Sequence, residues 1–226
     1  MMRLLLISSS TVHGYGYLDQ PEPEIRSFLG GAKHIAFVPF AIHDRDAYAV
    51  KVRERLGRMG FEVQQVRGPA DLDRAEAVFV GGGNTFRLLK ALYETKTMEA
   101  IGRRVRAGMP YMGASAGSNI AGLTIKTTND MPIVYPPSFD ALGFVPFQIN
   151  PHYLDTDPSS THMGETREQR IVEFLEENET PVVAIREGCA IKVENGSTRL
   201  VGTRGARIFR RGQEPEEIAA GASFTV

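Results

Sequence analysis

The chain has 226 residues, of which 42% are hydrophobic and 23% charged, and its formal net charge is −1. This composition is typical of a globular protein with one large or two small domains, and the lack of a basic surplus argues against nucleic acid as a partner. No apolar run is long enough to cross a bilayer or to act as a signal sequence, so we expect a cytoplasmic protein without a membrane partner.

The cysteine and histidine content argues against structural metal sites. Cys189 is the only cysteine, which excludes an intrachain disulfide. The histidines are widely spaced and form no pair with zinc-ligand spacing. We therefore expect no metal and no other cofactor. Cys189 lies in a strand-like segment, where it is expected to pack as a small apolar residue rather than to act as a nucleophile.

The first half of the chain alternates short apolar segments with longer amphipathic ones, as βαβ folds do. The apolar segments show little alternation, which predicts parallel strands buried on both faces. Strands are predicted at 4–8, 35–38, 62–66, 77–80 and 111–112. Helices are predicted at 47–59, 85–95 and 98–107, the first of them ending at Gly60.

A glycine-rich loop follows the strand predicted at 77–80. The segment from Gly81 to Thr85 reads GGGNT and stands directly before a helix. Main-chain N–H groups of such loops converge at the edge of a sheet and bind anions. The loop lacks the spacing and the Lys-Ser/Thr pair of a phosphate-binding loop. We favour an oxyanion-binding role, with the N–H of Gly83 as donor, over a phosphate site or a plain turn.

The run from Tyr111 to Asn119 reads YMGASAGSN and contains G-x-S-x-G, the pattern of a nucleophile elbow. Such a turn holds a serine hydroxyl, here that of Ser115, above the sheet between a strand and a helix. Its neighbours must be small, because larger side chains would collide with the packed strand and helix. The N–H of Ala116 begins the helix and can point at an oxyanion. The pattern also occurs by chance in turns without chemistry.

The segment 123–153 contains five prolines and is predicted to form loops with short strands. Near its end, His152 follows Pro151 and an apolar run. A strand end here would deliver the imidazole to the sheet edge at which the elbow lies. His152 is therefore our candidate for the general base that a serine nucleophile needs, although a lone histidine is more often structural.

Two carboxylates are candidates for the acid that orients the base. Asp130 lies in the sequence TTND, and Glu187 follows a strand predicted at 182–185. Each has a structural alternative, since Asp130 can cap a turn and Glu187 can lie solvated in a loop. The sequence leaves this choice open.

The C-terminal part begins with a predicted helix and then becomes rich in strands. Thr166 and Gln169 form a predicted capping box, with Thr166 as the N-cap. The helix is expected to turn four apolar residues toward the core: Ile171, Val172, Phe174 and Leu175. Further strands are predicted at 190–193, 198–201 and 206–209, with hairpin turns at Asn195-Gly196 and Arg211-Gly212.

Five motifs stand in one order along nearly the whole chain: GGGNTF from Gly81, SAG from Ser115, TTNDMPIV from Thr127, QINPH from Gln148 and GETREQR from Gly164. Together they resemble peptidase E, the α-aspartyl dipeptidase family. The resemblance implies a flavodoxin-like α/β fold akin to class I glutamine amidotransferases, with a mainly parallel central sheet and helices on both faces. The strands after the last helix would add a C-terminal antiparallel extension to this single domain of residues 1–226.

The resemblance also implies an activity, the release of aspartate from dipeptides with N-terminal Asp. It matches Ser115 to the nucleophile and His152 to the base, and it matches either Asp130 or Glu187 to the third member. Arg167 would bind the substrate's β-carboxylate, in the first turn of a helix where the dipole favours an anion. Further candidate substrate-binding residues in these motifs are Asn84, Thr128 and Asn129.

Two other functions remain alternatives. One is a cyanophycinase-like hydrolase that acts on β-aspartyl bonds. The other is a non-catalytic domain that binds a small molecule on a flavodoxin-like sheet. Exposed apolar residues near the proline-rich loops also make a homodimer an option.

Overall fold

A computed structural model describes residues 1–157, 159, 161 and 163–226. Its larger sheet has seven strands in the order β3-β2-β4-β5-β1-β8-β9. The first five in that order are parallel, and β8 and β9 continue the sheet in antiparallel fashion. The strands are β1 (Leu4–Ile7), β2 (His34–Val38), β3 (Glu62–Gln65), β4 (Ala77–Val80), β5 (Tyr111–Ala114), β8 (Cys189–Glu194) and β9 (Ser197–Gly202).

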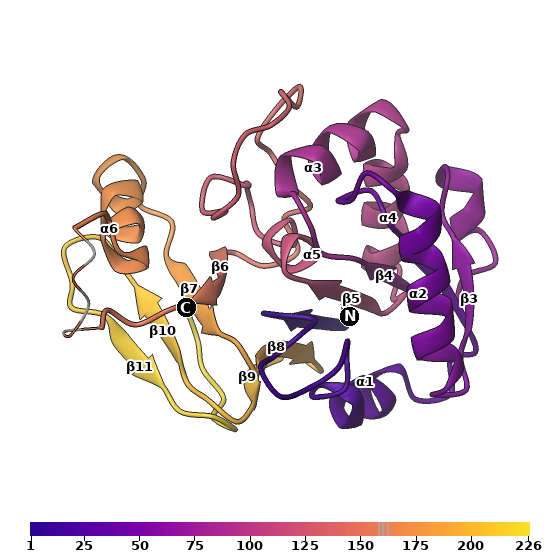
Figure 1. Cartoon of the computed structure of the whole chain (residues 1–226), viewed down its shortest axis with the longest axis horizontal. Helices are drawn as coiled ribbons and strands as arrows, with labels where there is room; N and C mark the ends of the chain where they lie inside the picture. Colours follow the sequence, from indigo (N-terminus) through magenta and orange to yellow (C-terminus); the bar gives the residue numbers. More distant parts are fainter. Residues whose placement is uncertain (158, 160, 162) are drawn as a thin grey trace.

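Helices cover both faces of this sheet (Figure 1). Side chains of successive strand residues point to opposite faces, so Leu4 and Leu6 of β1 pack with the helices α3 and α4, whereas Leu5 and Ile7 pack with α1 and α2. The predicted fold class is therefore confirmed. The helices of this layer are α1 (Glu22–Leu29), α2 (Arg45–Gly57), α3 (Thr85–Glu94), α4 (Thr97–Arg106) and the short α5 (Ala116–Asn119), with a 3-10 turn, η1, at Pro69–Leu72.

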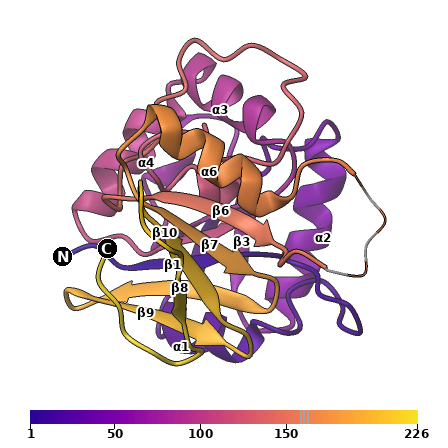
Figure 2. The same cartoon turned by 90° about the vertical axis from the view of Figure 1, so that its left-hand side faces the viewer.

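A second, four-stranded sheet has the order β11-β10-β7-β6. Helix α6 (Arg167–Glu177) lies across its strands (Figure 2) and buries Ile171 and Leu175 on it. In this sheet β6 and β7 are parallel, and β10 and β11 are antiparallel to their neighbours. The strands are β6 (Gln148–Tyr153), β7 (Val182–Arg186), β10 (Ala206–Phe209) and β11 (Glu216–Ile218). The predicted C-terminal extension is thus divided between two sheets.

Several predicted boundaries need correction. Helix α2 ends at Gly57 rather than at residue 59, and Gly60, with φ 93°, lies in the turn that follows. Val172 was expected in the core, but it is 48% exposed, because α6 turns Ile171, Phe174 and Leu175 toward the small sheet and Val172 away from it. The predicted turn at Asn195-Gly196 is confirmed, as it joins β8 to β9. No helix in the described ranges is long and apolar enough to cross a membrane.

Candidate active site

Ser115 lies at the turn between β5 and α5, with φ 52° and ψ −110°. The approach of strand to helix is very close: a Cβ added to Gly113 would lie 2.4 Å from the Gly117 oxygen, and one added to Gly117 would lie 2.1 Å from the Val80 oxygen. The Ser115 N–H donates to the Ile7 oxygen at 2.9 Å, which ties the turn to the neighbouring strand β1. The structure therefore has the elbow geometry that the G-x-S-x-G pattern predicts.

The imidazole of His152 lies between a hydroxyl and a carboxylate. Its Nε2 is 2.8 Å from Ser115 Oγ and its Nδ1 is 2.8 Å from Glu187 Oε1. Ser115 follows β5 of the large sheet and His152 lies on β6 of the small sheet, whereas Glu187 lies in the turn that joins β7 of the small sheet to β8 of the large one. A hydrogen-bonded series of hydroxyl, imidazole and carboxylate is the arrangement that activates a serine in hydrolases.

Asp130, the other carboxylate that the sequence offers as a partner for the base, instead forms hydrogen bonds at the start of α3. Its Oδ2 accepts hydrogen bonds from the Thr85 N–H at 2.7 Å and from Thr85 Oγ1 at 2.6 Å. Thr128 Oγ1 donates to the same oxygen at 3.2 Å. Of the two carboxylates, Glu187 is therefore the one in contact with His152, and Asp130 holds a loop against the N-terminus of α3.

The glycine-rich loop packs on the elbow. A Cβ added to Gly82 would lie 3.0 Å from the Cβ of Ser115. The Gly82 N–H donates to the hydroxyl of Tyr48 at 3.1 Å, and burial raises the pKa of this tyrosine. Within the described residues, the N–H groups of Gly83 and Ala116 make no hydrogen bond. Both N–H groups therefore remain free to donate, and Ala116 directly follows Ser115. Sequence reasoning missed Tyr48, which lies far from the loop in the chain.

Arg167 stands in the first turn of α6. The predicted capping box is confirmed, since Thr166 Oγ1 accepts from the Gln169 N–H at 3.1 Å and Gln169 Oε1 accepts from the Thr166 N–H at 2.7 Å. Burial lowers the pKa of the half-buried Arg167, and the charge of Arg170 lowers it further, while Asp130 opposes the shift.

The carboxylates beside Arg167 have other partners. Glu168, its neighbour in α6, pairs with Arg207 at 2.6 Å. Within the described part of the chain, no carboxylate lies within ion-pair distance of the Arg167 guanidinium. The helix terminus and this cation therefore offer an anion-binding position.

The remaining predicted substrate-binding residues have partners inside the protein. Asn84 caps α3 by accepting from the Arg87 N–H at 3.0 Å, and its Nδ2 donates to the Met131 oxygen at 2.8 Å. Asn129 Nδ2 donates to the Pro151 oxygen at 2.9 Å. Together with Thr128, these side chains hold the proline-rich loop against α3 and β6.

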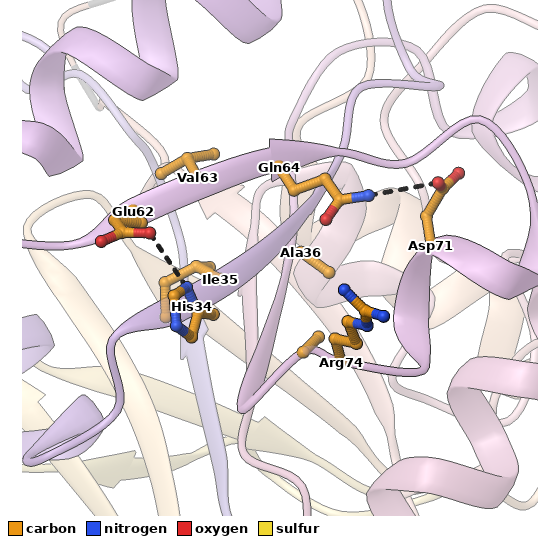
Figure 3. Close-up of a pocket in the computed structure, with 9 residues that line it drawn as sticks. His34, Ile35, Ala36, Glu62, Val63, Gln64, Asp71 and Arg74 are labelled. Atoms are coloured by element: carbon orange, nitrogen blue, oxygen red, sulfur yellow. Dashed lines mark hydrogen bonds and ion pairs between the residues drawn. The ribbon is translucent and has the colours of Figure 1, made fainter.

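A cavity of about 380 Å³ lies elsewhere on the large sheet. Figure 3 shows His34 beside Glu62 and Gln64 beside Asp71, with Arg74 at the rim. His34 and Glu62 are the first residues of β2 and β3. The cavity thus opens at the amino ends of the parallel strands, whereas Ser115 follows the carboxyl end of β5. It is separate from the Ser115 site.

Comparisons with known proteins identify the family of this chain. The model of peptidase family S51 matches residues 4–201. The protein named peptidase E of Streptomyces coelicolor is 55% identical, with 99% of this chain and 94% of the relative covered. The probable alpha-aspartyl dipeptidase of Drosophila melanogaster is 45% identical, with 98% and 95% covered.

A solved structure of a putative peptidase E from Listeria monocytogenes has the same fold. It aligns with a TM-score of 0.66 at 23% identity, with 98% of this chain and 100% of that chain covered.

Proposed function

This chain belongs to peptidase family S51, and from that premise we propose that it is a serine dipeptidase that removes N-terminal aspartate from Asp-X dipeptides. One observation carries the proposal. Ser115 stands on a nucleophile elbow with its hydroxyl 2.8 Å from His152 Nε2, and Nδ1 of the same ring is 2.8 Å from Glu187. The name of the Drosophila relative supplies the aspartyl substrate.

In the proposed reaction Ser115 is the nucleophile. His152 Nε2 takes the hydroxyl proton as Oγ attacks the aspartyl carbonyl, and Glu187 accepts from Nδ1–H and so keeps the ring in the required tautomer. The N–H groups of Gly83 and Ala116 donate to the oxyanion, where loss of one donor slows turnover by about 100- to 1,000-fold. His152 then protonates the leaving amine. Water attacks the aspartyl ester with the same base, which releases aspartate and restores Ser115.

Arg167 selects the acyl group in this proposal. Its planar guanidinium can donate two parallel hydrogen bonds to the substrate's β-carboxylate. A substrate with asparagine or leucine in the first position would displace water and leave the cation unpaired. Removing one partner of a desolvated charge pair costs about 2–5 kcal/mol. Since Arg167 is only half buried, we expect the lower end, about 2 kcal/mol or roughly 30-fold in kcat/KM.

A dipeptide panel tests the proposal. Release of the first residue is measured for Asp-Leu, Glu-Leu, Asn-Leu, Leu-Leu and isoaspartyl-leucine, with Ser115→Ala as the matched variant. We expect preference for Asp-Leu, and loss of both hydrolysis and fluorophosphonate labelling in Ser115→Ala. Preference for isoaspartyl-leucine would favour a cyanophycinase-like hydrolase. Unimpaired cleavage by Ser115→Ala would exclude Ser115 as the nucleophile.

We also propose that the protein works in the cytoplasm as a homodimer. A buried free thiol at Cys189 suits a reducing compartment. The proline-rich loop exposes Met131 at 75% and Tyr135 at 84%, an apolar surface that a second copy can cover. Sedimentation of the wild type beside a Tyr135→Ser variant tests this, because a dimer formed through the loop should dissociate in the variant.

A further inference from the structure

We propose that Ser8 is a positioning residue that holds His152 and Glu187 in their reactive arrangement. This inference rests on the proposed function. Ser8 directly follows β1 in the large sheet and is fully buried. It is not part of the hydroxyl–imidazole–carboxylate series, and in the sequence its only signal is its place at the carboxyl end of a predicted strand.

The hydroxyl of Ser8 joins the two sheets beneath the site. Its Oγ accepts a hydrogen bond from the His152 N–H at 2.9 Å and donates one to the Ile185 oxygen at 2.8 Å. The Ser8 N–H donates to the Cys189 oxygen at 3.0 Å. One small side chain therefore contacts the backbone of both strands that carry the base and the acid.

His152 needs this contact because its backbone leaves the ordinary strand conformation. Its φ is 57°, and the pairing of β6 with β7 is irregular between Asn150 and Tyr153. The left-handed region is unfavourable for a residue with a side chain, and such a residue keeps it only where surrounding contacts enforce it. The Ser8 hydroxyl accepts from the N–H of this strained residue and so helps to fix the direction of the imidazole.

The same end of β1 also fixes the nucleophile. The Ile7 oxygen accepts from the Ser115 N–H at 2.9 Å and from Ser118 Oγ at 2.7 Å. Ile185, which accepts from Ser8, lies two residues before Glu187 in the sequence. Neighbouring atoms of Ile7 and Ser8 thus bond directly to the backbone of Ser115 and His152, and they bond through Ile185 to the strand that leads to Glu187.

The experiment measures Asp-Leu hydrolysis by Ser8→Ala. We expect kcat to fall about 10- to 100-fold, because a small displacement of a reacting group has an effect of this size. KM should stay within about twofold, since no substrate contact is lost. The rate at which a fluorophosphonate labels Ser115 should fall in parallel. Ser8→Cys keeps the shape of the side chain but replaces the hydroxyl by a slightly larger and weaker hydrogen-bonding group. It should also lower kcat, which keeps the test usable if the alanine variant folds poorly.

A double variant separates positioning from a general loss of structure. If Ser8 acts through His152, adding Ser8→Ala to His152→Ala should leave the residual kcat unchanged. Once the imidazole is absent, Ser8 has no catalytic group left to position, so the losses in kcat from the two substitutions do not multiply. Ser9→Ala is the matched control. Ser9 is also buried, but among the described residues its hydroxyl bonds only to Thr11, donating to the Thr11 oxygen at 2.5 Å and accepting from its N–H at 3.3 Å, so its loss should leave kcat unchanged.

The outcomes are distinguishable from failure of the proposed function. A wild-type protein that does not cleave Asp-Leu would reject that function whatever Ser8 does. If the wild type cleaves Asp-Leu and a Ser8→Ala variant with unchanged Tm keeps full kcat, Ser8 has no positioning role. An equal loss in the His152→Ala background would also overturn the proposal, because it would mean a general structural effect.

Discussion

Both the nucleophile and the base of the proposed triad have left-handed backbone, with φ 52° at Ser115 and 57° at His152. Such conformations cost about 1–3 kcal/mol each and persist where the surroundings enforce them. Here the enforcing contacts are hydrogen bonds from the two main-chain N–H groups to Ile7 and Ser8. At the scale of single residues, the site is therefore a strained geometry that the end of β1 stabilises.

The two carboxylates that the sequence left open should behave differently when neutralised. Glu187→Gln removes the acceptor that fixes the His152 tautomer, so we expect kcat for Asp-Leu to fall by about 10⁴-fold, as loss of the acid does in a well-studied serine protease. Tm should change little, because the Glu187 side chain is 36% exposed. Steady-state kinetics and thermal unfolding of the same sample check both statements.

Asp130→Ala is the comparison variant for Glu187→Gln. It leaves the Thr85 N–H and hydroxyl without their acceptor, so it should lower the free energy of unfolding by about 1–3 kcal/mol. Its effect on activity should come through the loop that Asp130 holds. An Asp130→Ala variant with wild-type stability would contradict the structural role of Asp130. A Glu187→Gln variant with wild-type kcat would contradict the catalytic role of Glu187.

The elbow glycines should tolerate no side chain. Gly117→Ala would place a methyl carbon 2.1 Å from the Val80 oxygen, a backbone atom, so we expect a loss of about 3 kcal/mol or more in the free energy of unfolding. Gly57→Ala, in helix α2 with no atom of the described residues within 4 Å of the added carbon, should instead raise the free energy of unfolding by about 0.5–1 kcal/mol. Urea unfolding measures both, and equal effects would contradict the argument.

At the scale of elements, one arginine fixes the helix of Arg167 relative to the strand of His152. Arg207 on β10 donates from Nη1 to the Tyr153 hydroxyl at 2.8 Å and to Glu168 Oε2 at 2.6 Å. Burial raises the pKa of Tyr153, so its hydroxyl stays protonated. Tyr153 and Glu168 are the sequence neighbours of His152 and Arg167. In the proposed function, this contact therefore sets the distance between the triad and the proposed carboxylate-binding residue Arg167.

Replacement of Arg207 should therefore weaken substrate binding more than chemistry. For Arg207→Met we expect KM for Asp-Leu to rise about 10-fold and kcat to change less. The reason is that a displaced Arg167 guanidinium is no longer aligned with the β-carboxylate of the substrate. Arg210→Met is the control, since Arg210 pairs with Glu216 at 2.8 Å near the end of the same strand. If both variants keep the wild-type KM, α6 is positioned by packing alone.

The elements themselves were predictable where local chemistry determines them. The elbow and the capping box depend on neighbours in the sequence, so G-x-S-x-G and the pair Thr166 and Gln169 were sufficient to predict them. Strand β6 was less visible because Pro151 interrupts its pattern, and proline is tolerated there because β6 is an edge strand. Helix α1, with Pro21 at its N-cap and Pro23 in its first turn, was not predicted from the sequence.

At the scale of the whole molecule, the site lies where two sheets meet. Sequence motifs identified Ser115, His152 and Glu187 as candidates, but they did not predict that His152 lies on a separate sheet and Glu187 in the turn that joins the two sheets. That arrangement depends on contacts between distant segments, such as the bond from His152 to Ser8, 144 positions apart in the chain. Pairing of this kind leaves no local pattern, which is why Ser8 and Tyr48 became apparent only in the structure.

Long-range ion pairs also link the N-terminal helix to the body of the molecule. Glu22 of α1 accepts from Arg55 of α2 at 2.5 Å and from Arg26 at 2.7 Å. The Arg55 side chain is 12% exposed and also pairs with Asp19 at 2.8 Å. The hydrogen bonds from Arg55 and then Arg26 lower the pKa of Glu22 below its usual value. The folded state therefore favours the ionised carboxylate.

This shift predicts how stability depends on pH. Because the pKa of Glu22 is lower in the folded than in the unfolded chain, its contribution is complete above the unfolded value of about 4.3 and is lost as the pH falls through the folded value. Glu22→Gln should lower stability at pH 7 by about 1 kcal/mol or less, and the difference from wild type should shrink steadily below about pH 4.3. Thermal unfolding across this range measures it, with Glu24→Gln as a control for the helix dipole. A difference that stays constant down to acid pH would show that Glu22 stabilises α1 by packing rather than by charge.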